Sequence, residues 1–347
     1  MANEPTATKP YRILFFCGER SPWGFAHLKP LLTTTQIELV AIVLATDRCW
    51  DTFHQQLTGE LPKRPRSFIR FGKDLVKLIL RRQNLSPTAK VHQQAARQKI
   101  PVITCDDVNS AENITLFQTY QPDFILAAAY PQFFKTGVLT ICPNHVFNSH
   151  PSLLPKYRGA HPIFWVIASG ETKTGGTIHQ MTSRLDQGDI IAQLSLEFLP
   201  SDTYVKLYAK LINLVPDLVE AFLTALTTGQ KISLPQDPSQ ATYFRNDRKI
   251  HHSIFWPEMT AEQIYNLVRA CNGQAYFWVG QNKIAVHQVS ISSTNRNMTN
   301  NLTVPPGTVV DQTHNGPVVA AKKGYVCLEK LIQPKFRKFN FQIGQVL

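Results

Sequence analysis

Short apolar runs alternate with segments of helical periodicity along the first two thirds of this chain. The runs lie at residues 11–18, 37–45, 100–103, 124–129 and 146–148, and each has the length and composition of a buried strand. Between them, residues 24–32 and the stretch that opens at Ser86-Pro87 have helix-like patterns. Parallel strands need a helical crossover, so this alternation predicts an α/β, Rossmann-like, doubly wound parallel sheet, with its ligand crevice at the carboxyl ends of the strands.

The last third of the chain has a different pattern. A polar stretch with two prolines follows the helical segment at 204–226, and beyond a second helical segment the chain breaks into short runs separated by glycine- and asparagine-containing turns. This pattern predicts a small, OB-like β-barrel. The predicted layout is a flexible leader at 1–10, a first domain at 11–228 with a basic insertion at about 49–85, a linker at 229–241, and a C-terminal β-barrel domain at 242–347.

Basic residues are concentrated in two places. The formal net charge is +12, and residues 60–99 hold eleven lysines and arginines against two acidic residues. A second basic cluster lies between residues 322 and 338. Such patches suggest a polyanionic partner such as RNA, or an anionic membrane surface, although a solvated basic face without a partner gives the same composition.

Composition argues against several classes of protein. With 43% hydrophobic and 17% charged residues, the chain is predicted to be globular rather than disordered. No uninterrupted apolar stretch approaches the ~20 residues that a membrane span needs, and the N-terminus lacks the apolar core of a signal peptide. The six cysteines are scattered without a C-x-x-C pair, and the His251-His252 pair has no third ligand at metal spacing. These features predict a cytoplasmic protein with reduced thiols and without a metal site.

Polar side chains of complementary chemistry follow the apolar run at 146–148. Asn148 and His150 lie two residues apart, and Asp186 lies in a polar segment downstream. Transfer of an acyl group to an amine creates an oxyanion, which needs hydrogen-bond donors, and moves a proton from the amine to the leaving group. An amide and an imidazole oriented by a carboxylate supply both functions. Taken singly, however, a turn asparagine, a packed histidine and a loop aspartate account for the same residues.

Two longer segments resemble a known family. Residues 148–159 read Asn-Ser-His-Pro-Ser-Leu-Leu-Pro-Lys-Tyr-Arg-Gly, and residues 176–191 contain Gly-Thr-Ile-His-x-Met followed by Leu-Asp-x-Gly-Asp-Ile-Ile. Both resemble the signatures of formyltransferases that use 10-formyltetrahydrofolate. The resemblance implies the formyltransferase fold, this folate as co-substrate, and a catalytic trio of Asn148, His150 and Asp186.

The same resemblance implies which residues contact the folate. The segment that follows His150 matches the loop lining the folate side of the site, and the run that begins at Phe124 resembles the strand and loop that frame the pterin pocket. The residues so implied are Ser152, Leu153, Leu154, Pro155, Ala128 and Tyr130.

The C-terminal segments indicate which formyltransferases the chain resembles most. Residues 254–270, 306–309 and 324–331 are similar to the start and the later strands of a C-terminal barrel domain found in methionyl-tRNA formyltransferases. That layout covers most of residues 11–347 and implies that the acceptor is the amino group of methionyl-tRNA, the charged initiator tRNA. The basic residues would then contact phosphates, whose binding weakens steeply with salt. The candidate acceptor contacts are Arg48, Arg81, Arg82, Lys90 and Arg158.

One segment differs from the pattern of the tRNA enzymes, so acceptors other than methionyl-tRNA remain alternatives. The segment at 49–85 is longer than the compact, glycine-rich stretch that the tRNA enzymes usually carry, and it contains a basic amphipathic pattern. It could bind RNA, contact a membrane, or shape a pocket for a nucleotide-linked amino sugar or another small amine. A relative from another class, which binds RNA or folate without catalysis, is the remaining alternative.

Overall fold

The computed structural model describes residues 9–46, 49, 87–228, 233–244, 249–292, 304–332 and 339–347. Arg48, Arg81 and Arg82, together with most of the basic insertion, lie outside these residues. The chain divides into two compact units. The first comprises Met1–Gly159, Gly175–Leu196 and Ala209–Tyr243, and the second comprises Ala160–Thr174, Glu197–Tyr208 and Phe244–Leu347. The domain boundaries inferred from the sequence stay a prediction.

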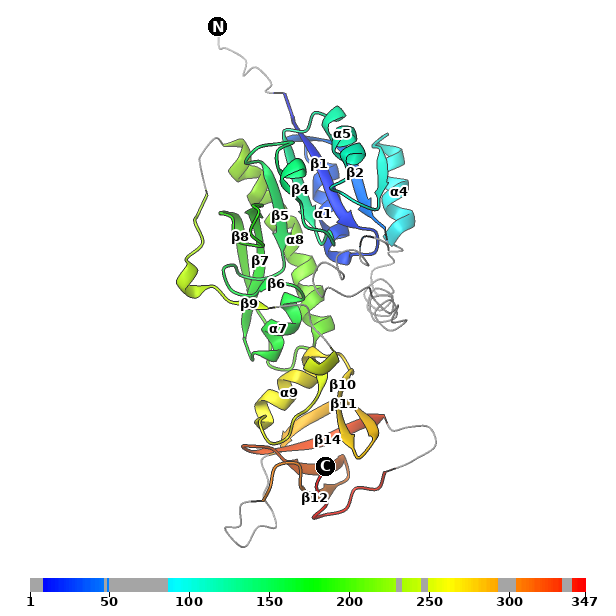
Figure 1. Cartoon of the computed structure of the whole chain (residues 1–347), viewed down its shortest axis with the longest axis vertical. Coiled ribbons are helices and arrows are strands. Elements are labelled where there is room, and N and C mark those ends of the chain that lie inside the picture. The colour runs from blue at the N-terminus through cyan, green and yellow to red at the C-terminus, as the bar shows by residue number, and fades with distance from the viewer. Residues whose placement is uncertain are drawn as a thin grey trace. The chain divides into compact units, whose positions relative to one another are not determined.

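The first unit is built around a seven-stranded sheet of order β3-β2-β1-β4-β5-β7-β8 (Figure 1). Its strands are β1 (Tyr11–Gly18), β2 (Ile37–Ala45), β3 (Val102–Cys105), β4 (Phe124–Ala128), β5 (Val146–His150), β7 (Lys173–Gln180) and β8 (Ile190–Glu197). The helices between and after them are α1 (Pro22–Thr33), α4 (Pro87–Arg97), α5 (Ala111–Thr119), α6 (Thr136–Leu139) and α8 (Tyr204–Thr227). The strands from β3 to β5 pair in parallel, which confirms the predicted α/β fold.

The middle segments of the central strands of this sheet are completely buried. Residues 13–17 of β1 and residues 41–44 of β2 have no exposed surface, as expected for parallel strands covered on both faces. The third strand begins two residues later than predicted, at Val102 rather than Ile100. Pro101 explains the shift, because proline has no N–H to donate to a strand ladder and here accepts from Ile42 N–H through its carbonyl.

The pair β5 and β7 departs from the predicted parallel arrangement. These strands run antiparallel, with Asn148 directly opposite His179 and His150 opposite Thr177. Residues directly opposite one another on an antiparallel pair point to the same face of the sheet. The carboxyl end of β5 therefore meets the middle of β7, and side chains from two distant segments face one another.

The second unit contains a five-stranded antiparallel sheet of order β10-β11-β14-β13-β12, which agrees with the predicted C-terminal β domain. Its strands are β10 (Ala275–Val279), β11 (Asn282–Ser292), β12 (Val309–Thr313), β13 (Gly316–Ala320) and β14 (Tyr325–Ile332). Helix α9 (Ala261–Ala270) begins with a capping box between Thr260 and Gln263 and contacts β11, β14 and α7 (Pro162–Ala168). The remaining short elements are β6 (Arg158–Gly159), β9 (Tyr243–Phe244), η1 (Pro238–Gln240) and η2 (Lys249–His252).

Over the described ranges, no helix is long and apolar enough to cross a membrane. All six cysteines are buried and outside disulfides.

Candidate active site

Asn148 and His150 occupy alternate positions at the carboxyl end of β5, so their side chains share one face of the sheet. His150 is 5% exposed and Asn148 is partly exposed. Ser149 points to the opposite face of the sheet, where it holds β5 through hydrogen bonds to α1. Its carbonyl accepts from the Trp23 indole N–H at 3.1 Å, and its hydroxyl lies 2.8 Å from His27 Nε2.

Asp186 reaches this face from the loop between β7 and β8. Its Oδ2 accepts from Gly159 N–H at 2.8 Å and lies 3.8 Å from His150 Nδ1, and only 6% of the residue is exposed. The structure therefore brings the three residues predicted as a catalytic trio to one place. Their catalytic roles stay a prediction that activity measurements must test.

His179 is a fourth member of this cluster that sequence reasoning missed. Its Nε2 lies 3.4 Å from the Asn148 side-chain nitrogen and 3.5 Å from Asp186 Oδ1. It is 2% exposed. The residue stood inside the second family-like segment, but only the antiparallel register of β5 and β7 places it beside Asn148. In the sequence, the one indication of a role for His179 was that it is a polar residue inside the segment that forms the buried strand β7.

Backbone carbonyls fix the protonation of both imidazoles. His150 Nε2 lies 2.8 Å from Tyr157 O, and His179 Nδ1 lies 2.8 Å from Gln180 O. A carbonyl only accepts, so each of these nitrogens carries a proton. In the neutral His150 ring the other nitrogen, Nδ1, then presents its lone pair toward the Asp186 carboxylate, and His179 Nε2 lies beside the other carboxylate oxygen. The Asn148 amide N–H can donate to His179 Nε2, which holds that amide in place.

The electrostatics of the cluster keep the His150 ring neutral and the Asp186 carboxyl group ionised near pH 7. Burial lowers the pKa of His150, and the nearby Asp186 charge offsets this only in part, so the ring is neutral near pH 7. Burial alone would raise the pKa of Asp186, but His150, His179 and the Gly159 N–H outweigh it and lower the pKa to about 2. An ionised carboxylate thus faces a neutral imidazole whose lone pair is available, and it would stabilise a proton that arrives there.

The loop at residues 152–155, predicted to line the folate side of the site, is hydrogen-bonded to β7 and β8. Thr177 Oγ1 donates to Ser152 O at 2.6 Å, and Gln193 Nε2 donates to Leu154 O at 2.9 Å. Ser152 is completely buried and donates its own hydroxyl to Lys156 O, and Leu154 is followed by a cis peptide bond to Pro155. This loop has a defined shape, and Gln193, which the sequence did not mark, helps to set it. Folate contacts from the loop remain a prediction.

The other described residues predicted to contact folate or the acceptor lie on β4, α4 and β6 or just after β4. Ala128 ends β4 and is buried, and the Tyr130 ring packs edge-on against Phe16 and Phe134. Lys90 lies on α4. Arg158 is 8% exposed, and its guanidinium donates to Gln236 Oε1. Over the described part of the chain, no three histidine, cysteine or acidic side chains are grouped as a metal site.

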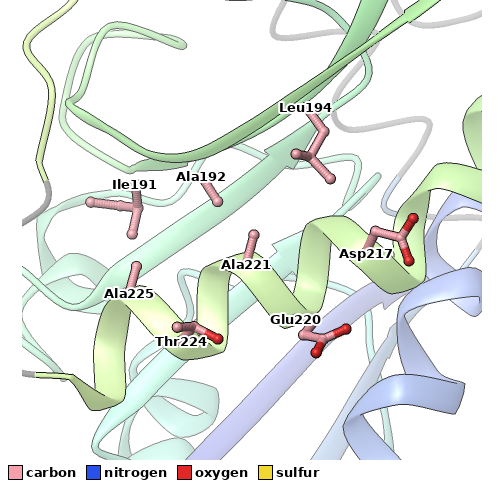
Figure 2. A pocket seen from close by; sticks show the side chains of 8 residues that line it. All are labelled: Ile191, Ala192, Leu194, Asp217, Glu220, Ala221, Thr224 and Ala225. Atoms are coloured by element: carbon pink, nitrogen blue, oxygen red, sulfur yellow. The ribbon is translucent and has the colours of Figure 1, made fainter.

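A hollow in the first unit is lined by none of the residues of this cluster. Figure 2 shows it between β8 and α8, and its lining is mainly apolar, with two carboxylates from α8. The residues that line it are Ile191, Ala192, Leu194, Asp217, Glu220, Ala221, Thr224 and Ala225. None of them supplies an imidazole or an amide, so the end of β5 remains the candidate for chemistry.

Gly188 is expected to be essential for the loop that carries Asp186. A Cβ atom at this position would lie 1.9 Å from Gln180 O, a backbone atom that cannot move aside without breaking β7. We expect Gly188→Ala to destabilise the protein by about 3 kcal/mol, as forced overpacking does. Urea denaturation would measure this loss. The control is Gly280→Ala, where an added Cβ meets open space and only the φ of 57° is unfavourable, at about 1 kcal/mol. Equal losses in both variants would contradict the steric argument.

Comparison with known proteins agrees with this geometry. Residues 72–221 match the family Formyl transferase, and residues 248–341 match Formyl transferase, C-terminal domain. Among solved structures, an N-formyltransferase from Helicobacter canadensis with folinic acid and dTDP-3-aminofucose has a TM-score of 0.59 at 15% identity, covering 92% of this chain and 99% of that one. The sugar 3N-formyltransferase WlaRD has a TM-score of 0.58 at 17% identity, covering 93% and 98%.

A further similar structure is HypX from Aquifex aeolicus with tetrahydrofolic acid, with a TM-score of 0.54 at 15% identity. It covers 94% of this chain, but the chain spans only 45% of HypX. At these identities the structural likeness establishes a common fold and no more. The two family matches together span more than two thirds of the sequence and include the Asn148, His150 and Asp186 segments. The chain belongs to the formyl transferase family.

Proposed function

We propose that this protein transfers a formyl group from 10-formyltetrahydrofolate to a primary amine. The observation that carries the proposal is the convergence of an amide, two imidazoles and an ionised carboxylate at the end of β5. Similar folds hold folates in the Helicobacter canadensis enzyme and in HypX, which supports folate as the donor.

The chemistry follows from the placement of these groups. A neutral amine forms a bond to the formyl carbon, and the carbonyl oxygen becomes an alkoxide that needs donors. The Asn148 amide, held through its other N–H by His179, donates to this oxygen. His150 Nδ1 accepts the proton that the amine loses, and Asp186 stabilises the resulting imidazolium. The bond between the formyl carbon and folate nitrogen then breaks, and that nitrogen takes the proton, which yields a formamide and tetrahydrofolate.

Methionyl-tRNA is the acceptor that we propose first. The net charge of +12 and the basic residues of the C-terminal unit favour a large polyanion. Lys322, Lys323 and Lys330 are exposed on that unit.

A nucleotide-linked amino sugar is the second candidate. Two sugar N-formyltransferases match this chain over nearly their whole length, one of them in complex with dTDP-3-aminofucose. A diphosphate on such a substrate would also be attracted by a basic protein.

The acceptor assay separates these candidates. The full chain would be incubated with 10-formyltetrahydrofolate labelled in the formyl group, in parallel with methionyl-tRNA and with a dTDP-linked amino sugar. We expect label in formyl-methionyl-tRNA, with a rate that falls steeply between 50 and 200 mM salt, as phosphate contacts require. Transfer to the sugar alone would overturn the tRNA acceptor. Absence of transfer to any amine, with folate still bound, would favour the non-catalytic alternative.

A further inference from the structure

The backbone at Asp186 is held in an unfavourable conformation. Its φ of 53° lies in the left-handed region, which costs a non-glycine residue of order 1 kcal/mol or more. Such a conformation persists only where surrounding contacts impose it. One contact is the Gly159 N–H on Oδ2, but this holds the side chain and leaves the backbone of the loop to be fixed by another group.

Gln236 supplies that contact. Its side-chain nitrogen donates to Asp186 O at 2.9 Å and to Gly188 O at 2.7 Å, which uses both of its N–H groups on one loop. The residue is 9% exposed, so these hydrogen bonds are formed away from bulk water. Two carbonyls on either side of Gln187 are thereby fixed relative to a single planar amide.

The other end of the Gln236 amide is fixed as well. Its oxygen accepts from Arg158 Nε at 3.1 Å and from Arg158 Nη2 at 2.7 Å, and the guanidinium is itself buried. Arg158 lies between Tyr157, whose carbonyl accepts from His150, and Gly159, whose N–H holds Asp186. The His150 ring is thus linked to the backbone of Asp186 through the Tyr157–Arg158 backbone, the Arg158 guanidinium and the one Gln236 amide.

The segment that carries Gln236 is predicted as a linker from its composition, yet it is bound along this site. Leu234 exchanges two backbone hydrogen bonds with Ile190, and Thr242 accepts from the N–H groups of Tyr157 and Arg158. Gln236 is therefore placed by neighbours on both sides rather than by its own side chain alone. This placement makes it suited to hold another loop.

We infer that Gln236 is a positioning residue for the formyl transfer reaction, which sets the distance between the Asp186 carboxylate and His150 by fixing the Asp186 backbone. The inference rests on the proposed function of the trio. Gln236 hydrogen-bonds to the backbone of the Asp186 loop rather than to the Asp186 carboxylate, so we expect it to change the rate of the chemical step and not folate binding.

The test uses Gln236→Glu in the full chain. The variant keeps an oxygen for Arg158 but replaces the donating NH2 with an oxygen that faces two carbonyls. We expect kcat to fall about 10-fold with an unchanged KM for the folate. In an Asp186→Asn background the same substitution should lower kcat no further, because its effect passes through Asp186. The matched control is Gln240→Glu, the same change on the same segment at an exposed residue that contacts Asp237.

A second measurement does not depend on activity. Gly159 N–H donates to Asp186 Oδ2, so its amide hydrogen exchange reports whether the carboxylate is in place. We expect exchange at least about 10-fold faster in Gln236→Glu and unchanged in Gln240→Glu; Gln236→Met replaces Gln236→Glu if the latter does not fold. If the wild type transfers no formyl group but Gly159 exchange still responds, the proposed function fails and the positioning role stands. If the wild type is active, and both kcat and Gly159 exchange in the Gln236 variants match the wild type, the inference is overturned.

Discussion

His150→Ala is expected to lower kcat for formyl transfer at least about 100-fold, the usual contribution of a positioned acid–base group. The reason lies in the two ring nitrogens. Nε2 is committed to Tyr157 O, so Nδ1 is the nitrogen that accepts the proton of the attacking amine. Without it, this proton has to leave to solvent from a buried site, and the tetrahedral intermediate returns to reactants more often.

The matched control for this substitution is His145→Ala. His145 precedes β5 by one residue, is exposed, and packs edge-on against Phe124 without reaching the cluster. Single-turnover rates and melting temperatures would be measured for both variants, because His150 is buried and its loss also leaves a cavity. A His150→Ala enzyme that is folded and turns over within a few-fold of the wild type would remove His150 from the mechanism.

The cluster of Asn148, His150, His179 and Asp186 at the end of β5 shows which features of the site could be predicted from the sequence and which could not. Asn148 and His150 could be found because two polar residues two apart at the end of a buried strand must share a face. Asp186 could be found only through its family-like segment, since no periodicity relates it to β5. Its left-handed φ was not predictable, because that conformation is imposed by contacts from residues 159 and 236.

His179 and Gln236 were missed for a different reason. The alternation of strands and helices predicted parallel neighbours, whereas β7 returns antiparallel and places His179 opposite Asn148. Direction and register of a strand depend on pairing across the fold, which a local pattern does not record. Gln236 lies in a stretch whose prolines and polar residues are typical of a linker, and its two-ended hydrogen bonding exists only after Arg158 and the Asp186 loop have come together.

Asp186→Asn is expected to lower kcat by on the order of 100-fold or more and to move the acidic limb of the pH–rate profile to lower pH. The asparagine can still accept from Gly159 N–H, so the variant removes mainly the negative charge. That charge raises the pKa of His150 against the lowering effect of burial. Without it the pKa of His150 falls further, and the neutral, proton-accepting ring persists to a lower pH. The rate is lower throughout because the imidazolium formed during the reaction has lost its counter-charge.

The direction of the pH shift is what distinguishes this mechanism from its rival. If Asp186 were itself the proton acceptor, the acidic limb would report its own titration, and Asp186→Asn would abolish that limb instead of displacing it. Because the pKa of Asp186 is lowered to about 2, a limb observed between pH 4 and 8 would report the titration of His150 and not that of Asp186. Rate profiles from pH 4 to 8, with the fold checked at each pH by circular dichroism, would decide between the two. A limb that stays at the wild-type pH in Asp186→Asn would show that the carboxylate and His150 are not coupled, and the proposed proton transfer would then be wrong.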